Sequence, residues 1–237
     1  NMADTAVVTG ASSGVGRAVA VRLAKAGWNV AVVSRRAEEL AETIRLAGKA
    51  GKTMAAFVCD ISHEGEVEKM AAGVLKRFGT VRALVNSAGT NAPRRSWREV
   101  SLETYRELME TNLTGAYLCT RAFLPGMRER KCGSVVNIVS DAGLTANAKA
   151  GAAYVMSKFG MTGMTQSLNC EERENGIRAT SIFPGDIDTP LLEKRPVQPT
   201  PEARARMLQA DDVAACVMLA LELPERAVVE GLVIRPR

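Results

Sequence analysis

The stretch TAVVTGASSGVGRAVAVRLAKAG, residues 5–27, decides the fold. It predicts a buried β-branched strand, a glycine-rich turn and an amphipathic helix that ends at Gly27. Gly10, Gly14 and Gly16 allow the backbone to turn tightly and to approach a pyrophosphate, while the start of the helix presents free N–H groups and the positive end of its dipole. A strand, a turn and a helix in this order predict a phosphate-binding βα unit.

The spacing of the glycines narrows the class of nucleotide site. The pattern is G-x-x-x-G-x-G and not G-x-G-x-x-G, and it lacks the Gly-Lys-Ser/Thr ending of a nucleotide-hydrolysing P-loop. Ser12 and Ser13 add hydroxyl donors to the loop. An ordinary turn is the alternative interpretation, so the assignment depends on the rest of the chain.

The rest of the chain alternates short apolar runs with amphipathic segments, which predicts an α/β protein. The 237 residues, 46% of them hydrophobic, are enough to bury one core, and we expect a single domain over 1–237. The pattern predicts strands at 5–9, 29–34, 53–59, 82–86, 134–140, 178–183 and 231–235, and helices at 15–26, 37–49, 63–78, 102–130, 152–174 and 211–222. Such alternation indicates a Rossmann-type doubly wound parallel sheet of about seven strands with helices on both faces.

A possible acid/base group lies in the second half of the chain. Tyr154 and Lys158 stand four residues apart in the run AYVMSK, and Ser140 ends the apolar stretch SVVNIVS. On a helix this spacing puts both side chains on one face, about 6 Å apart at Cβ. Because a free phenol titrates near 10, a nearby cation is needed before Tyr154 can act as a base at neutral pH. We predict that Lys158 favours the phenolate; a solvated helical pair is the alternative.

Six motifs together resemble the short-chain dehydrogenase/reductase family. In family order they are TGASSGVG at 9–16, NSAG at 86–89, Asn112 within TNLTG, Ser140, YVMSK at 154–158 and PGDIDTP at 184–190. The resemblance implies a hydride-transferring oxidoreductase that uses a nicotinamide dinucleotide and acts on a carbonyl or alcohol. A 3-oxoacyl-(acyl carrier protein)-like or general carbonyl reductase is favoured. A non-catalytic NADP-sensing protein and an NAD-dependent alcohol dehydrogenase remain alternatives.

The resemblance also implies a role for individual residues. Ser140 would hydrogen-bond the substrate oxygen, Tyr154 would exchange a proton with it, Lys158 would hold the nicotinamide ribose, and Asn112 would bind a water that links Lys158 to solvent. The full set of implied cofactor-binding residues is Gly10, Ser12, Ser13, Gly14, Val15, Gly16, Ser34, Arg35, Arg36, Asp60, Ile61, Asn86, Ala88, Gly89, Tyr154, Lys158, Pro184, Gly185, Ile187 and Thr189.

The end of the second predicted strand indicates which dinucleotide is preferred. An NAD site of this type carries an acidic residue there to accept hydrogen bonds from the ribose 2′-hydroxyl, whereas this chain has Ser34, Arg35 and Arg36. A hydroxyl and a guanidinium both favour a 2′-phosphate. We therefore predict NADP(H), with Arg35 as the phosphate ligand and Arg36 over the adenine or in solvent. A charged helix start is the alternative.

The substrate itself is not identified by any motif. Candidate contacts are Thr90, Asn91, Arg94, Arg95, Asp141, Ala142, Thr145, Asn147 and the proline-rich loop 185–202, which includes Lys194 and Arg195. Those basic residues could attract an acidic substrate or an acyl carrier protein, although solvated loop charges are the more ordinary interpretation.

Composition excludes several other classes. The single histidine, His63, and five cysteines without C-x-x-C spacing predict no metal site, and the cysteines are expected to be buried thiols. The net charge of +5 is spread along the chain and aromatic residues make up 4%, so nucleic-acid binding is not expected. No apolar run of membrane length and no signal peptide is found, which favours a cytoplasmic protein without membrane contact. The resemblance to short-chain dehydrogenase/reductases also implies a homodimer or homotetramer built on 102–130 and 152–174 and on the last strand region.

Overall fold

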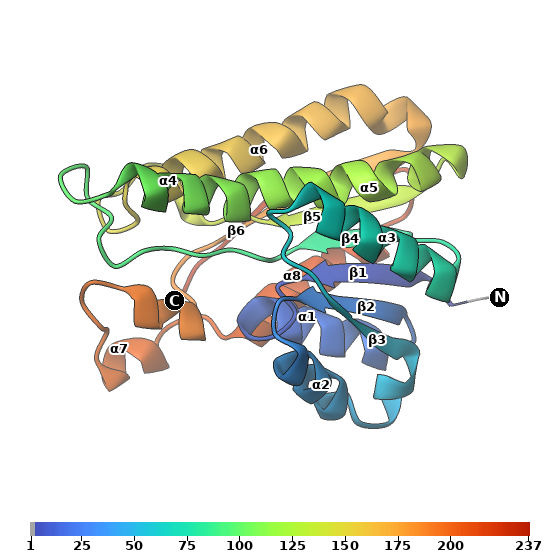
Figure 1. The fold of residues 1–237 in the computed structure, drawn as a ribbon, viewed down its shortest axis with the longest axis horizontal. Coiled ribbons are helices and arrows are strands. Elements are labelled where there is room, and N and C mark those ends of the chain that lie inside the picture. Colours follow the sequence, from blue (N-terminus) through green and yellow to red (C-terminus); the bar gives the residue numbers. More distant parts are fainter. Residues whose placement is uncertain (1–2) are drawn as a thin grey trace.

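A computed structural model, which describes residues 3–237, contains one parallel sheet in the strand order β3-β2-β1-β4-β5-β6-β7 (Figure 1). The strands are β1 Thr5–Thr9, β2 Asn29–Ser34, β3 Met54–Val58, β4 Ala83–Asn86, β5 Gly133–Ile138, β6 Ile177–Pro184 and β7 Gly231–Ile234. The α-helices are α1 Gly14–Lys25, α2 Ala37–Leu46, α3 Glu64–Phe78, α4 Leu102–Met109, α5 Gly115–Glu129, α6 Ala152–Glu172, α7 Pro201–Ala205 and α8 Ala210–Glu222. The predicted doubly wound fold is confirmed.

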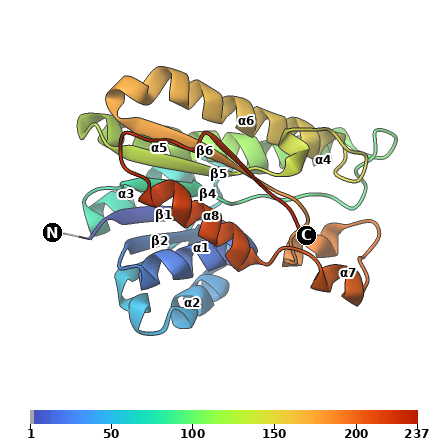
Figure 2. The same cartoon turned by 180° about the vertical axis from the view of Figure 1, so that it is seen from behind.

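The central strands β1, β4, β5 and β6 are almost fully buried because helices cover both faces of the sheet. Along β1, Val8 faces a core shared with α1, α2 and α8, whereas its neighbour Val7 faces a second core shared with α3 and α5. Figures 1 and 2 show these helices on opposite sides of the sheet, with α4, α5 and α6 together on one side. The predicted alternation of strands and helices thus builds two apolar layers around one sheet.

Two predicted elements end differently in the structure. The helix predicted over 102–130 is interrupted by a π-helical segment, Glu110–Thr114, between α4 and α5. Asn112 lies inside this segment, and single π-helical turns of this kind often occur where a side chain has a special task. The strand predicted over 134–140 ends at Ile138, so Ser140 lies beyond the sheet and starts a short 3₁₀ turn.

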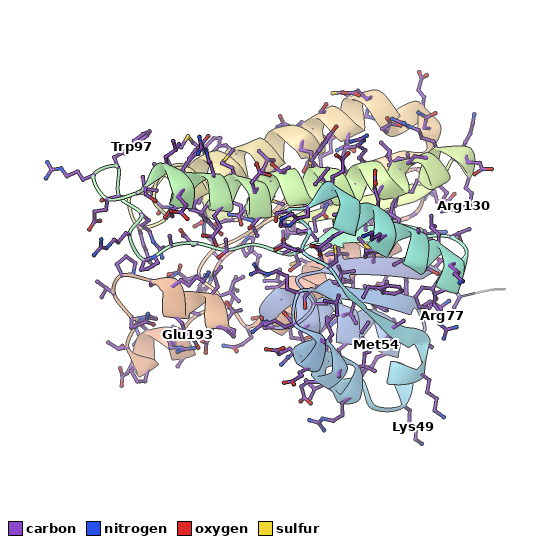
Figure 3. The ribbon with its side chains drawn as sticks, in the orientation of Figure 1. Lys49, Met54, Arg77, Trp97, Arg130 and Glu193 are labelled. Atoms are coloured by element: carbon purple, nitrogen blue, oxygen red, sulfur yellow. The ribbon has the colours of Figure 1, made fainter. Side chains whose placement is uncertain are left out.

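The segment predicted as a loop, 185–202, contains helical turns. Its prolines favour a prediction without regular structure. Pro190–Lys194 form a 3₁₀ turn, and α7 begins at Pro201, where Thr200 accepts a hydrogen bond from the Ala203 N–H and so caps the helix. Figure 3 shows Glu193 and Trp97 at one end of the molecule and Arg77 and Arg130 at the other. The segments around 97 and 193 therefore share one end of the domain.

The five cysteines are free thiols. Cys59 and Cys119 are buried as expected, whereas Cys132 and Cys216 are half-buried and Cys170 is exposed, so the expectation that all are buried is wrong for these three. Within residues 3–237, no helix is long and apolar enough to cross a membrane.

Candidate active site

A cavity of about 950 Å³ lies at the carboxyl ends of the strands. Its walls come from the segments that directly follow β1 to β6, which is where open α/β sheets bind ligands. All of the catalytic and cofactor-binding residues predicted from the sequence line this cavity, except Asn86 and Asn112. The fold therefore brings together residues from Gly10 to Thr189 that are far apart in the chain.

The glycine loop is shaped by contacts that exclude any side chain. Gly10 has a φ of +65°, and a Cβ there would lie 2.7 Å from the backbone of Ala88. A Cβ on Gly16 would lie 2.4 Å from the carbonyl oxygen of Gly10. Thr9 Oγ1 accepts hydrogen bonds from the N–H groups of Ser87 and Ala88, at 3.1 and 3.2 Å, which joins the loop to the segment after β4.

The start of α1 suits an anion. The first turn of α1 contains no acidic residue, and Ser13 at its N-cap makes no side-chain hydrogen bond to the helix backbone. The free N–H groups and the hydroxyl of Ser13 are therefore available to a phosphate at the positive end of the helix dipole.

Arg36 lies over the glycine loop. Its guanidinium donates hydrogen bonds to Ser12 Oγ at 2.9 Å and to Ser13 Oγ at 3.4 Å, and it also lies 3.2 Å from a carboxylate oxygen of Glu39. A guanidinium between two hydroxyls at the end of β2 is a good phosphate-binding group. In this structure it is Arg36, the residue predicted to lie over the adenine or in solvent, that contacts the loop.

Arg35 points to the neighbouring strand end. Its guanidinium lies 3.5 Å from Asp60, and 69% of the side chain is exposed. Asp60 also accepts hydrogen bonds from the Ser62 hydroxyl and N–H, at 2.7 and 3.1 Å. Both arginines line the cavity, and the last residue of β2 is Ser34 rather than an acid.

Tyr154 and Lys158 lie side by side at the base of the cavity, on successive turns of α6. Lys158 is 3% exposed, and its Nζ lies 5.6 Å from the centre of the Tyr154 ring and donates a hydrogen bond to the carbonyl of Ile138 at 2.9 Å. Burial lowers the pKa of Lys158 to about 7. The i, i+4 spacing thus produces the expected contact, but Lys158 is directed to the end of β5.

The pKa of Tyr154 is raised, not lowered, which corrects the predicted effect of Lys158. Burial raises the pKa of Tyr154 to about 12, and a hydrogen bond with Ser140 and the charges of Arg95 and Arg195 oppose this only in part. Lys158 is not among the groups that shift it. The physical reason is that desolvation of the phenolate outweighs the surrounding cations, while Lys158 carries only part of its charge at neutral pH.

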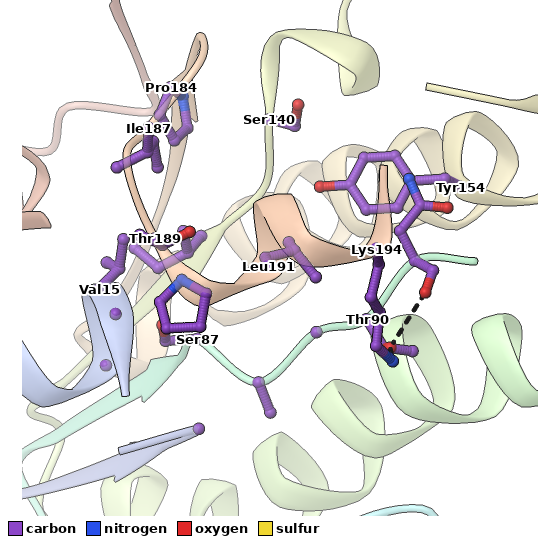
Figure 4. Close-up of a pocket in the computed structure, with 18 of the residues that line it drawn as sticks. Val15, Ser87, Thr90, Ser140, Tyr154, Pro184, Ile187, Thr189, Leu191 and Lys194 are labelled. Atoms are coloured by element: carbon purple, nitrogen blue, oxygen red, sulfur yellow. Dashed lines mark hydrogen bonds between the residues drawn. The ribbon is translucent and has the colours of Figure 1, made fainter. Parts of the chain in front are cut away.

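Ser140 is the N-cap residue of the 3₁₀ turn Asp141–Gly143. Its Oγ accepts a hydrogen bond from the Ala142 N–H at 3.1 Å and donates one to Asp141 Oδ1 at 3.0 Å. Figure 4 shows the Ser140 hydroxyl and the Tyr154 phenol on the same side of the cavity. The end of β5 and the first turn of α6 therefore present two hydroxyls to one space.

Asn112 and Asn86 are buried behind the cavity, so neither side chain contacts a ligand there. The Asn112 amide accepts from the Thr90 N–H at 2.7 Å and donates to the Thr90 carbonyl at 3.0 Å and to Ser157 Oγ at 3.1 Å. Its hydrogen bonds are thus used to position the segment after β4 against α6. This explains the polar residue inside a helix, and it leaves no side-chain donor for the predicted water.

The cofactor role predicted for Asn86 is corrected in the same way. Its Nδ2 donates to Thr120 Oγ1 at 3.2 Å and to Asn137 Oδ1 at 2.9 Å, and its Oδ1 is buried without a partner among the described residues. The Asn86 side chain is 1% exposed and does not line the cavity. Asn86 therefore belongs to the interior.

The cavity also includes most of the candidate substrate contacts. Arg94 and Thr145 lie outside it, whereas the other individually named candidates line it, together with Thr111, Lys149, Ala150 and Asp186. Lys149 and Asp186 are 2.6 Å apart although they are 37 residues apart in the chain. No local pattern marks such a pair, because each residue is an ordinary loop charge until the fold brings the loops together.

Known proteins resemble this chain in sequence and in fold. A family model described as short chain dehydrogenase matches residues 4–199. A protein of Streptomyces coelicolor named as a ketoacyl reductase is 37% identical over 190 residues, which cover 79% of this chain and 72% of the relative. D-beta-hydroxybutyrate dehydrogenase of Rhizobium meliloti is 34% identical, covering 92% and 83%. The crystal structure of a variant actinorhodin polyketide ketoreductase with NADPH superimposes with a TM-score of 0.90 at 32% identity, covering 98% and 95%.

Proposed function

The chain belongs to the short-chain dehydrogenase family of oxidoreductases, and from this premise we propose that it transfers a hydride between NADP(H) and the carbonyl or alcohol carbon of a small molecule. The observation that carries the proposal is that Ser140, Tyr154 and Lys158 line the same cavity as the glycine loop. An acid/base group and a dinucleotide-binding loop in one cavity are what hydride transfer to a carbonyl requires.

The residues at the cofactor end fit an NADP-type dinucleotide. The side-chain-free surface at Gly10 and Gly16 and the N-terminus of α1 suit a pyrophosphate. The Arg36 guanidinium and the hydroxyls of Ser12 and Ser13 can bind a 2′-phosphate. The last residue of β2 is Ser34, so no carboxylate at this position repels the phosphate. When bound, the nicotinamide supplies or accepts the hydride. An NADPH-bound structural relative supports this choice.

Tyr154 and Ser140 would act on the substrate oxygen. With a pKa of about 12, Tyr154 is protonated at neutral pH and is suited to give its proton to the oxygen of a carbonyl that is being reduced. Ser140 would turn its hydroxyl from Asp141 to the same oxygen and stabilise the charge that develops there. Lys158 would hold the nicotinamide ribose from the floor of the cavity. The raised pKa keeps the phenol in the protonated form that carbonyl reduction requires.

The names of the relatives support a substrate with a carbonyl or alcohol group, but they do not identify a particular compound. One relative is named for ketoacyl reduction and another for hydroxybutyrate oxidation, so a carbonyl of the 3-oxoacyl type is the first to test. A non-catalytic NADP-sensing protein would bind the dinucleotide and turn over no carbonyl.

The test is a screen of carbonyl compounds with NADPH oxidation followed at 340 nm. Tyr154→Phe should lower kcat by about 10³-fold or more because the proton donor is lost, while NADPH still binds with unchanged affinity. The matched control is Tyr105→Phe, because Tyr105 lies on α4 outside the cavity. Retained turnover in Tyr154→Phe would remove Tyr154 from the mechanism. NADPH binding without turnover of any carbonyl would favour a sensor.

Self-association is proposed for the outer side of α5 and α6. Tyr117 on α5 and Met156 and Phe159 on α6 are 52%, 38% and 44% exposed, and large apolar side chains exposed on the surface favour an interface. Light scattering at micromolar concentration should give a multiple of the 25.3 kDa chain mass. A monomer mass would contradict this proposal.

A further inference from the structure

The cavity walls carry twice as many basic as acidic side chains. Eight lysines and arginines line the cavity, against four aspartates and glutamates. Arg35 and Arg36 belong to the cofactor end, and Lys158 lies on the floor. At the other end Asp186 pairs with both Lys149 and Arg195, at 2.6 and 2.5 Å, so its single negative charge offsets only one of the two positive charges. Arg235 lines the cavity beside Gly185. The two remaining basic groups, Arg95 and Lys194, have no carboxylate partner among the described residues and need separate explanation.

Arg95 is a buried cation held by backbone groups alone. It is 7% exposed, and its guanidinium donates hydrogen bonds to the carbonyl oxygens of Ala92 at 2.5 Å, of Lys149 at 3.3 Å and of Lys194. No carboxylate within residues 3–237 lies at ion-pair distance from it. Carbonyl dipoles satisfy the hydrogen bonds but leave the positive charge, which therefore acts on the cavity at close range.

Lys194 presents a second cation to the same space. Its Nζ donates a hydrogen bond to Thr90 Oγ1 at 2.5 Å, and Figure 4 shows the Lys194 side chain reaching toward Thr90. In the part of the chain that the structure describes, no carboxylate is paired with Lys194. Thr90 is itself fixed by two hydrogen bonds to Asn112. The ammonium group is therefore placed at the cavity by a chain of contacts that begins inside the protein.

The acidic side chains of this region offset its basic side chains only in part. Asp186 is already paired twice, whereas Asp141 has no ion-pair partner among the described residues, and its charge raises the pKa of Tyr154. Glu193 and Lys194 are both exposed in the same 3₁₀ turn. The four basic and three acidic side chains at this end of the cavity leave a net positive charge, which favours a ligand that brings its own negative charge.

We infer that the substrate is a carbonyl compound that carries a carboxylate, an oxo acid, with Lys194 as the ligand of the carboxylate and with Arg95 positioning Lys194 through the hydrogen bond to its backbone carbonyl. The inference rests on the proposed function and names its substrate class. In the reaction, the carbonyl carbon takes a hydride from NADPH, the carbonyl oxygen takes a proton from Tyr154, and the carboxylate is unchanged. The products are a hydroxy acid and NADP⁺.

The test compares each oxo acid with its uncharged methyl ester in the purified chain. Short 3-, 4- and 5-oxo acids are assayed with NADPH, together with their esters and a neutral 3-oxoacyl thioester. We expect kcat/KM to be roughly tenfold or more higher for one of the acids than for its ester. In Lys194→Met the KM for that acid should rise about tenfold while the KM for the ester stays within about twofold. Lys194→Arg should keep most of the preference.

Lys52→Met is the matched control. Lys52 is exposed and lies outside the cavity, and the substitution removes the same positive charge. It should change neither KM. The inference is overturned if the ester or the thioester is the better substrate in the unmutated chain, or if Lys194→Met affects acid and ester alike. In both cases carbonyl reduction stands. If no carbonyl compound is turned over, the proposed function fails and the substrate class fails with it.

Discussion

Replacing Lys158 should make the protein more stable while it removes the proposed activity. Lys158 is 3% exposed, and burial lowers its pKa from the usual 10.5 to about 7. Each pKa unit corresponds to about 1.4 kcal/mol, so holding a charged ammonium at this position costs about 5 kcal/mol below pH 7. Lys158→Met removes that cost and loses a hydrogen bond to Ile138 worth about 1 kcal/mol. A net gain of about 3 to 4 kcal/mol is expected near pH 6.

The sign and pH window of this effect follow from proton binding. An unfolded lysine holds its proton up to about pH 10.5, whereas folded Lys158 holds it only up to about pH 7. Between these values the unfolded state binds more protons, so the unmutated chain becomes more stable as the pH rises. The advantage of Lys158→Met should therefore be largest at pH 6 and fall by roughly 3 kcal/mol by pH 9.

The assay is urea unfolding of both proteins without added cofactor, at pH 6, 7, 8 and 9. The control is Lys52→Met, since Lys52 is exposed and its replacement should change the free energy of unfolding by less than about 0.5 kcal/mol at every pH. The reasoning is refuted if Lys158→Met is less stable than the unmutated chain at pH 6, or if the difference between them does not depend on pH.

Three further predictions use other contacts of the structure. Arg36→Ser should raise the KM for NADPH tenfold or more, because a charge-assisted phosphate contact is worth about 1.5 to 3 kcal/mol, and steady-state kinetics should show the KM for NADH unchanged; an equal effect on both would contradict it. Gly10→Ala should lower the free energy of unfolding in urea by about 2 kcal/mol or more, because of the positive φ and the 2.7 Å approach to Ala88; an unchanged midpoint would argue against it. Glu172→Ala should lose about 1 to 3 kcal/mol at pH 7, and the loss should shrink as the pH falls below 4.5 because the Arg128 hydrogen bond lowers the pKa of Glu172; a loss that persists at pH 3 would disprove the pairing.

Local patterns were sufficient to predict the sheet and the helices, and long-range contacts explain the differences. The strand boundaries follow from apolar runs whose periodicity is local, so β1, β2 and β4 agree with prediction to within a residue or so. The π-helical turn at Asn112 was not predicted, because its cause is a pair of hydrogen bonds to Thr90, 22 residues away in the chain. Asn86 was placed in the cofactor site by its motif, and only the sheet shows that its side chain faces inward.

The sequence by itself determined the order of strands and helices, the glycine loop, and the spacing that puts Tyr154 and Lys158 on one face of a helix. These features depend on backbone geometry and on neighbours a few residues away, which any single stretch of chain contains. The tertiary structure decided how the charges act. It raises the pKa of Tyr154 by burial, pairs both Lys149 and Arg195 with the single carboxylate of Asp186, and leaves Arg95 and Lys194 unpaired at the cavity among the described residues. Burial and pairing are properties of the surroundings, and in this chain those surroundings come from segments up to 104 residues apart.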